Sequence, residues 1–153
     1  MILTREELAA IQSQAEAEYP RECCGVVLVR NDPGPARRLF RCRNIQDELH
    51  ARDPVAHPRD ARTAYFIAPE DLLAIGRAEQ DGYRVHVIYH SHIDCGAYFS
   101  ETDRRNALLG DHPAYPEATY VVAAVNQGRM EEVRAFRWDA PAATFVPVPL
   151  EVT

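Results

Sequence analysis

The sequence predicts an α/β domain in which a mixed β-sheet is flanked by helices. Three observations support this class: helical patterns with start signals occur at three places, short β-branched runs separate and follow them, and no internal repeat is present. The length of 153 residues suits one domain, and 46% hydrophobic with 26% charged residues is an ordinary globular balance. We therefore expect residues 1–153 to form a single domain.

The N-terminal part predicts a helix followed by a hairpin. Thr4 and Glu7 have the spacing of a capping box, which predicts a helix over residues 5–18 that ends before a proline. Residues 24–30 form a short apolar run that is typical of a buried strand. A turn rich in Pro and Gly then leads to a partner strand over residues 37–43.

The middle of the chain changes character twice. Residues 44–62 are rich in Asp, His, Pro and Arg and show no periodicity, which predicts an irregular loop. Residues 64–67 predict a short strand. A helix opens at Pro69, which suits the first helical turn, and ends near Gly82. Residues 85–90 predict another apolar strand.

The C-terminal part predicts one more helix and three strands. Ser100 and Asp103 again have the spacing of a helix start, with Ser100 as the cap. Strands are predicted over residues 118–125, 130–138 and 144–149, with an Asn-Gln-Gly hairpin turn between the first two. Together these elements give a mixed sheet with helices outside it.

Composition excludes several classes of function. The net charge is −6, and all 17 basic residues are scattered arginines, so we expect no nucleic-acid partner. The apolar runs are too short to span a bilayer, and the N-terminus lacks the pattern of a signal peptide, so we expect no membrane association. Four cysteines without an export signal indicate reduced thiols and a cytoplasmic location.

The segment that indicates chemistry is His90-Ser91-His92, followed after seven residues by Ser100 and then by Asp103. Residues two apart on a strand point to the same face, so both imidazoles can reach one point. Asp103, in the first turn of the next helix, can fold back over the strand end. Two histidines and one carboxylate are a typical catalytic zinc set with one position left for water. We therefore expect His90, His92 and Asp103 to bind Zn²⁺.

Hydrolysis at such a site also needs a base and a group that stabilises an oxyanion. Glu22 is the candidate base, because a carboxylate directly before a buried strand is unusual. The hydroxyl of Ser100 can donate to an oxyanion. Taken singly, each residue has an ordinary explanation: a solvated loop glutamate, a helix cap, or histidines that fill space. The joint spacing favours the chemical explanation.

This pattern resembles the motif of the JAMM (JAB/MPN) zinc metalloprotease family, which is an upstream Glu, then His-Ser/Thr-His, seven residues, Ser, two residues and Asp. Every position is filled, and the likeness to the small prokaryotic members covers most of the chain. The resemblance implies the MPN fold and zinc ligation by His90, His92 and Asp103. It also implies Glu22 as general base, a zinc-bound water as nucleophile and Ser100 as oxyanion stabiliser.

Some nearby residues remain open to two interpretations. Ile93 and Phe99 stand where many family members have proline, and neither position supplies a ligand. Cys95 is either an additional soft ligand or an incidental loop residue. His86 has the same face parity as His90, so it either orients a ligand or simply packs in the strand.

The resemblance implies zinc-dependent hydrolysis of a peptide or isopeptide bond. Small bacterial relatives process the C-terminal tail of ubiquitin-like sulfur-carrier proteins ending in Gly-Gly, so such a carrier is the expected substrate. We expect the tail to join a sheet edge beside the zinc, with residues 44–62 as one wall. The alternatives are a non-catalytic MPN scaffold that retains the metal site and a purely structural metal. A zinc deaminase is disfavoured because the sequence lacks Pro-Cys-x-x-Cys.

Overall fold

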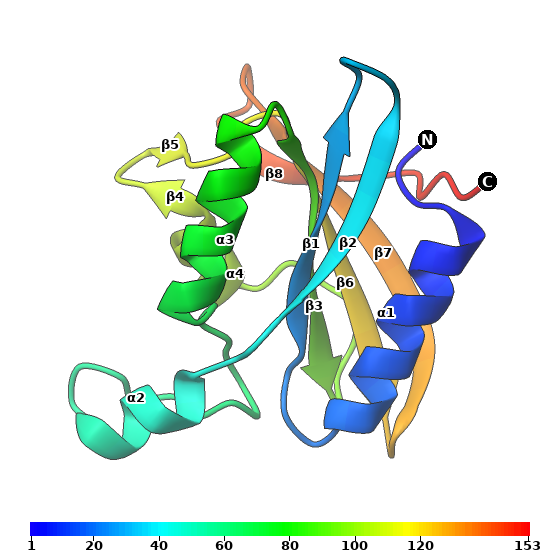
Figure 1. Cartoon of the computed structure of the whole chain (residues 1–153). Coiled ribbons are helices and arrows are strands. Elements are labelled where there is room, and N and C mark those ends of the chain that lie inside the picture. The colour runs from blue at the N-terminus through cyan, green and yellow to red at the C-terminus, as the bar shows by residue number, and fades with distance from the viewer.

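The computed structural model describes residues 1–153 and has helices on both faces of one large sheet (Figure 1). The helices are α1 (Arg5–Glu18), α2 (Gln46–Arg52), α3 (Pro69–Gln80) and α4 (Glu101–Ala107). The strands are β1 (Cys24–Arg30), β2 (Ala36–Cys42), β3 (Arg84–Ile93), β4 (Leu108–Leu109), β5 (His112–Pro113), β6 (Thr119–Asn126), β7 (Arg129–Asp139) and β8 (Thr144–Val148). Six strands form the sheet in the order β2-β1-β3-β6-β7-β8, while β4 and β5 pair separately. Only β3 and β6 run parallel, so the predicted mixed sheet is confirmed.

The two faces of the sheet carry separate apolar clusters. Ile11 and Ala15 of α1 pack on one face, together with Val87 of β3. Ile75 of α3 and Ala107 of α4 belong to the cluster on the other face, where α3 and α4 lie (Figure 1). None of the helices combines the length and the apolar composition needed to span a bilayer.

The predicted start and turn signals operate as expected. The Thr4 Oγ1 accepts from the Glu7 N–H at 3.1 Å, and the Glu7 carboxylate accepts from the Thr4 N–H at 2.8 Å. Arg37 of β2 binds both oxygens of the same carboxylate, which fixes the start of α1 to the sheet. Gln127 and Gly128 have φ angles of 51° and 84°, which suit a two-residue hairpin turn between β6 and β7.

Two predictions for the middle of the chain are wrong. Residues 46–52 form α2 rather than irregular loop. Residues 64–67 form no strand, and only an isolated bridge joins Asn44 to Ile67. The physical reason is that the Asn44 side-chain oxygen accepts from the Phe66 N–H at 3.0 Å, so a side chain takes a position that a neighbouring strand would fill. The short β4–β5 hairpin was not predicted.

The central strand β3 extends beyond the predicted range and contains an irregularity opposite β1. Val85 and Ile88 both belong to the cluster on the α3 side, although they are three residues apart. The face parity therefore changes between them, and His86 points away from His90. Its Nε2 lies 3.1 Å from the backbone oxygen of Met1. The prediction that His86 and His90 share one face of the sheet is therefore wrong, and His86 does not orient a metal ligand.

Candidate metal centre

The C-terminal end of β3 lies beside the segment that leads into β1. The Ser91 N–H donates to the Cys23 carbonyl at 3.1 Å, and the Cys23 N–H donates to the Ser91 hydroxyl at 2.7 Å. These bonds continue the antiparallel register by one residue before the start of β1, and Glu22, the next residue, lines the same pocket as His92. The serine between the two histidines thus positions the candidate base, a role that the sequence motif did not assign.

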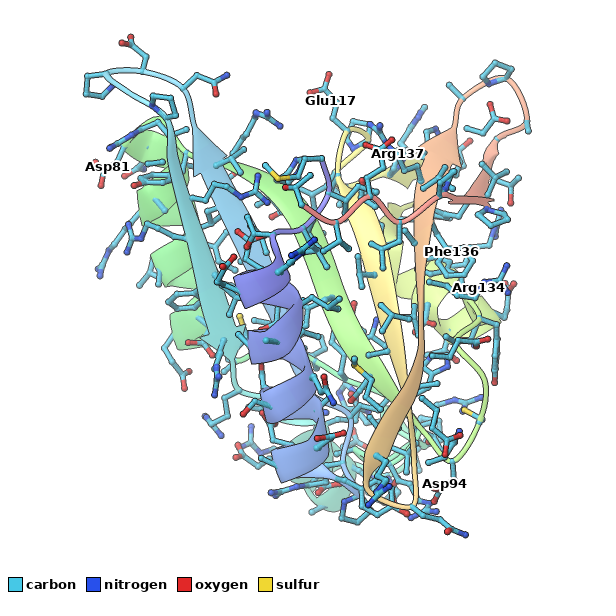
Figure 2. All side chains as sticks on the ribbon, turned by 90° about the vertical axis from the view of Figure 1, so that its right-hand side faces the viewer. Asp81, Asp94, Glu117, Arg134, Phe136 and Arg137 are labelled. Atoms are coloured by element: carbon cyan, nitrogen blue, oxygen red, sulfur yellow. The ribbon has the colours of Figure 1, made fainter.

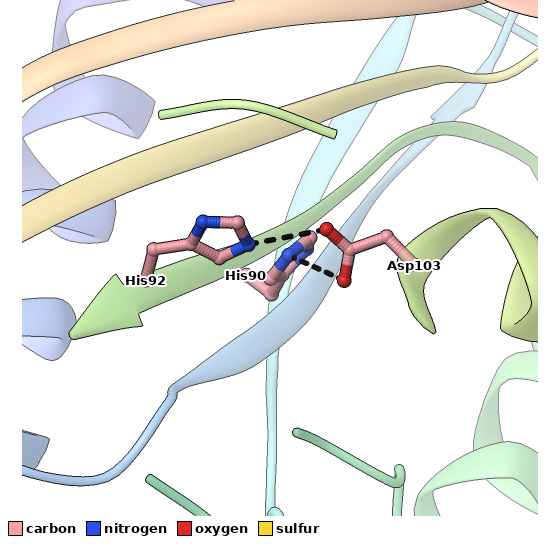
Figure 3. Close-up of side chains that lie close together, drawn as sticks. All are labelled: His90, His92 and Asp103. Carbon is pink, nitrogen blue, oxygen red and sulfur yellow. Dashed lines mark hydrogen bonds and ion pairs between the residues drawn. The ribbon is translucent and has the colours of Figure 1, made fainter. Parts of the chain in front are cut away.

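Three predicted ligands meet at this strand end. The Nε2 of His90 lies 3.1 Å from Asp103 Oδ1, and the Nε2 of His92 lies 3.1 Å from Asp103 Oδ2 (Figure 3). One potential ligand atom from each residue lies within 4.8 Å of the others. All three residues are buried. The structure therefore brings together the three residues that the sequence selected.

The contact between His92 and Asp103 needs a positive charge. The Nδ1 of His92 lies 2.9 Å from the Gly96 carbonyl oxygen. A carbonyl oxygen only accepts, so Nδ1 carries the hydrogen and Nε2 of the neutral ring presents a lone pair. That lone pair faces a carboxylate oxygen at 3.1 Å. Two acceptors at this distance are stabilised only by a cation between them, either a proton or a metal ion.

His90 has no hydrogen-bond partner at all. Its side chain is fully buried, and neither Nδ1 nor Nε2 makes a hydrogen bond, because the approach to Asp103 is close but misaligned. The ring stacks on Tyr65 with centroids 4.6 Å apart and an interplanar angle of 25°. Buried polar atoms are nearly always paired, so an unpaired imidazole calls for a functional explanation.

Asp103 is held by the start of α4. The Ser100 N–H donates to Asp103 Oδ2 at 2.9 Å, and the Ser100 hydroxyl accepts from the Asp103 N–H at 3.0 Å. Burial opposes ionisation of this carboxyl, but the neighbouring His90 and His92 and the Ser100 N–H together lower the pKa of Asp103 well below its ordinary value. The residue is therefore an anion poised beside two imidazoles.

Glu22 is a buried carboxyl with an unpaired oxygen. Its side chain is 4% exposed and Oε1 has no partner. Burial and the negative charge of Asp103 raise the pKa of Glu22 to about 9, while Arg59 opposes this shift. Its backbone is fixed, because its N–H donates to the Ala61 carbonyl at 2.7 Å and its carbonyl accepts from the Asn44 side chain at 2.9 Å.

These donors fit a zinc ion. Ligands at about 2.0–2.2 Å from zinc in a tetrahedral arrangement lie about 3.3–3.6 Å from one another. The 3.1 Å distances from His90 and His92 to Asp103 are close to that spacing. The unpaired nitrogens of His90 and the facing lone pairs at His92 supply the independent structural reason to place a cation here.

A pocket of about 510 Å³ opens over this centre. Glu22, His92 and Ser100 line it, so the candidate base, one ligand and the candidate oxyanion donor share one solvent-accessible space. Cys95 also lines the pocket, but it does not belong to the group of clustered ligand atoms. The remaining lining residues are Arg59, Ile93, Arg62, Thr63, Tyr98, Glu101, Thr102 and Arg105.

Sequence reasoning assigned no role to the residues that support this site. The side-chain nitrogen of Asn44 donates to the Glu22 and Ala64 carbonyls. Its side-chain oxygen accepts from the backbone N–H groups of Gln46 and Phe66, so Asn44 joins three segments. An asparagine beside a polar loop is too common to be selected by pattern alone. Arg59 and Arg105 line the pocket, and no local signal in the sequence distinguishes them from the other arginines.

Comparison with known protein families matches residues 4–139 to the family described as prokaryotic homologs of the JAB domain. The chain belongs to this family. The resemblance inferred from the His-Ser-His and Asp spacing is therefore confirmed. The matched range includes every residue of the centre described above, from Glu22 to Asp103.

Two curated relatives of this JAB-domain protein differ in how much of their length is matched. The chain is 28% identical to the CysO-cysteine peptidase of Mycobacterium tuberculosis over 149 residues, which is 97% of this chain and 89% of the relative. It is 35% identical over 102 residues to tail tip assembly protein K of Escherichia phage N15, which is 67% of this chain. The chain spans only about a third of that phage protein, because the match covers 34% of its length.

Solved structures support the fold of the JAB domain. A protein from Salinibacter ruber has a TM-score of 0.64 and 25% identity, with 100% of this chain and 92% of that protein covered. A protein from Desulfitobacterium hafniense has a TM-score of 0.66 and 17% identity, with 99% and 91% covered. The whole sheet and its helices thus follow a known α/β arrangement.

Proposed function

We propose that this chain is a zinc-dependent peptidase that hydrolyses a peptide or isopeptide bond at the C-terminal tail of a ubiquitin-like sulfur-carrier protein. The observation that carries the proposal is a buried group of two imidazoles and a carboxylate, in which the nitrogens of His90 make no hydrogen bond. Beside this group lies a buried glutamate, one oxygen of which also has no hydrogen-bond partner. Likeness to a CysO-cysteine peptidase over 97% of the chain supports the reaction class and a sulfur carrier as the substrate.

His90, His92 and Asp103 would hold the metal, and residues 1–153 would act as one catalytic domain. A zinc ion bound there lowers the pKa of a water molecule to about 7 and polarises a substrate carbonyl. The Gly96 carbonyl fixes the ring of His92, and the Ser100 N–H fixes the carboxylate of Asp103. The ligands are therefore oriented before any metal arrives.

Glu22 is the proposed general base. Burial, and after it the negative charge of Asp103, raises the pKa of Glu22, and a metal cation nearby would favour the ionised carboxylate. Glu22 then takes a proton from water as the water oxygen bonds to the carbonyl carbon. It returns that proton to the nitrogen as the carbon–nitrogen bond breaks, so the products are a carboxylate and an amine.

Ser100 is the proposed donor to the oxyanion. Its oxygen already accepts from the Asp103 N–H, so the hydroxyl hydrogen remains available to a substrate oxygen in the pocket. The helix cap thus fixes the position of the donor. A rigid donor stabilises developing charge without having to reorganise.

The expected entry of the tail along a sheet edge stays a prediction. β3 pairs with β6 as far as Ile93 but with β1 only as far as His90, so a tail could pair with β3 only over its last residues. The walls of the pocket come from α4 and from residues 59–63, which lie within the expected segment or directly after it. The tail would therefore lie across the strand end, between α4 and this segment.

A cleavage assay tests the proposal. A carrier protein with a Gly-Gly tail extended by further residues is incubated with the protein, with and without a chelator. We expect cleavage after the second glycine that stops with chelator and returns with Zn²⁺. Tight binding of the carrier without cleavage, in the presence of zinc, would contradict the peptidase and favour the non-catalytic scaffold.

A further inference from the structure

Arginines gather at the pocket of an otherwise acidic protein. The chain has a net charge of −6, yet Arg59, Arg62 and Arg105 line the pocket above the metal centre. The only acidic side chains in that lining are the buried Glu22 and the exposed Glu101. The mechanism proposed above uses none of the three guanidinium groups.

A second pocket continues from the first on the side of these arginines. It has a volume of about 290 Å³ and shares Arg59, Thr102 and Arg105 with the pocket over the metal centre. No acidic side chain lines it, and His57 is a further basic group there. The positive charge therefore lies beside the reacting groups, between the two pockets.

Two of the three guanidinium groups are free. Arg62 binds Asp94 at 2.8 Å, and Asp94 also accepts from Tyr19 and from the backbone N–H of Gln127. Asp94 lies at the end of the sheet where β6 turns into β7 (Figure 2). The side chains of Arg59 and Arg105, in contrast, make no ion pair and no hydrogen bond in this structure. They are thus available to a ligand.

The backbone of both arginines is held in place, by helix α4 for Arg105 and by a hydrogen bond for Arg59. Arg105 follows Asp103 by two residues on α4 and lies one turn after Thr102, which faces the same pockets. The Arg59 carbonyl accepts from the side chain of Gln46 in α2 at 2.8 Å. Ordered attachment reduces the entropy that is lost when a guanidinium binds a ligand.

We propose that Arg59 and Arg105 form a subsite for the free α-carboxylate of the segment that hydrolysis releases. This inference rests on the proposed peptidase function and names its substrate class. Guanidinium groups match carboxylates by paired hydrogen bonds, which makes arginine suited to reading a chain end. An isopeptide bond to a lysine within a folded protein offers no such carboxylate.

Binding of matched peptides tests this assignment without turnover. Two peptides ending in Gly-Gly-Ala, one with a free carboxylate and one with a C-terminal amide, are titrated into the zinc-loaded Glu22→Gln protein. We expect the acid to bind about tenfold more tightly or better, the effect of one charge-assisted hydrogen bond or more. The preference should vanish in an added Arg59→Gln/Arg105→Gln pair and persist with Arg77→Gln, which removes an exposed charge on α3.

The outcomes separate the two proposals. Equal binding of acid and amide, or a preference that survives the double substitution, overturns the assignment of Arg59 and Arg105, the latter because the carboxylate then binds the metal. The same titration with metal-free protein should retain the acid preference. If that preference depends on both arginines but the wild-type protein cleaves neither peptide nor carrier, the carboxylate site stands and the peptidase proposal fails.

Discussion

Two neighbouring residues of β3 carry buried polar groups that the protein treats in opposite ways. The Tyr89 hydroxyl points to the α1 face, donates to Gln14 Oε1 at 2.6 Å, and Gln14 in turn donates to the Cys24 carbonyl at 3.0 Å. His90 points to the other face, is equally buried, and makes no hydrogen bond. The same strand therefore carries a polar side chain with its hydrogen bonds made on one face and a polar side chain without hydrogen bonds on the opposite face.

The difference teaches which polar groups serve stability and which serve chemistry. A paired buried network stabilises the fold, whereas an unpaired buried group costs free energy unless something else binds it. On the α1 face, Gln14 completes the network from within the chain. On the α4 face, His90 and Glu22 have no such partner within the chain, and we expect a cation and a substrate to interact with them. Substitutions on the two faces should therefore separate stability from activity.

The largest expected effect is on catalysis. Replacing Glu22→Gln removes the proposed base but keeps the size of the side chain, so hydrolysis should fall by about 100- to 10,000-fold. Zinc content, measured by metal analysis, should not change. A Glu22→Gln variant that hydrolyses substrate at the wild-type rate would show that Glu22 is not the general base.

The same residue should make the stability of the metal-free protein depend on pH. The pKa of Glu22 is raised from 4.5 to about 9, so between these values the folded protein holds a proton that the unfolded chain releases. Stability should therefore fall by several kcal/mol as pH rises through this range. Chemical denaturation of metal-free wild type and Glu22→Gln at pH 5 and pH 9 checks this. We expect a steeper loss in wild type, and equal slopes would contradict the burial argument.

The side chain of Ser100 combines a proposed catalytic role with the structural role of a helix cap. Ser100→Ala should lower turnover by about 100-fold through the lost oxyanion donor. The lost helix cap should cost about 1 kcal/mol of stability. Ser100→Thr keeps the hydroxyl and serves as the matched control in both assays. A Ser100→Ala variant that loses stability but keeps its turnover would show that Ser100 acts only as a helix cap.

On the α1 face the effect should be purely structural. Gln14→Leu leaves the Tyr89 hydroxyl without a partner, which should cost about 1–3 kcal/mol in unfolding free energy. Turnover and zinc content should stay at wild-type values at a temperature where the variant is folded. Gln12→Leu, exposed on the same helix, is the control and should change stability by less than about 0.5 kcal/mol. Loss of zinc in Gln14→Leu would show that the two faces are coupled.

The sequence predicted what depends on local pattern. The capping boxes at Thr4 and Ser100 and the apolar strands are signals within a few residues of one another, and they appear in the structure. The metal set was predictable because His90 and His92 share a strand face and Asp103 opens the next helix. These features need no knowledge of distant contacts.

What failed depends on contacts between distant segments. α2 lacks an apolar stripe, and side chains such as Asn44 and Gln46 hold its surroundings in place. The face of His86 is reversed by an irregularity in the pairing of β3 with β1, which no window along the chain reveals. The convergence of Arg59 and Arg105 likewise arises only when α4 and the segment after α2 meet.

The most direct measurement is the zinc content of a matched pair of substitutions at the two neighbouring strand positions. Wild type and Tyr89→Phe should each bind one zinc per chain, while His90→Ala and Asp103→Asn should bind none or lose it readily to a chelator. Circular dichroism confirms that each variant is folded. A wild-type protein that binds no divalent metal, or a folded His90→Ala protein that holds zinc as tightly as wild type, would contradict the metal centre.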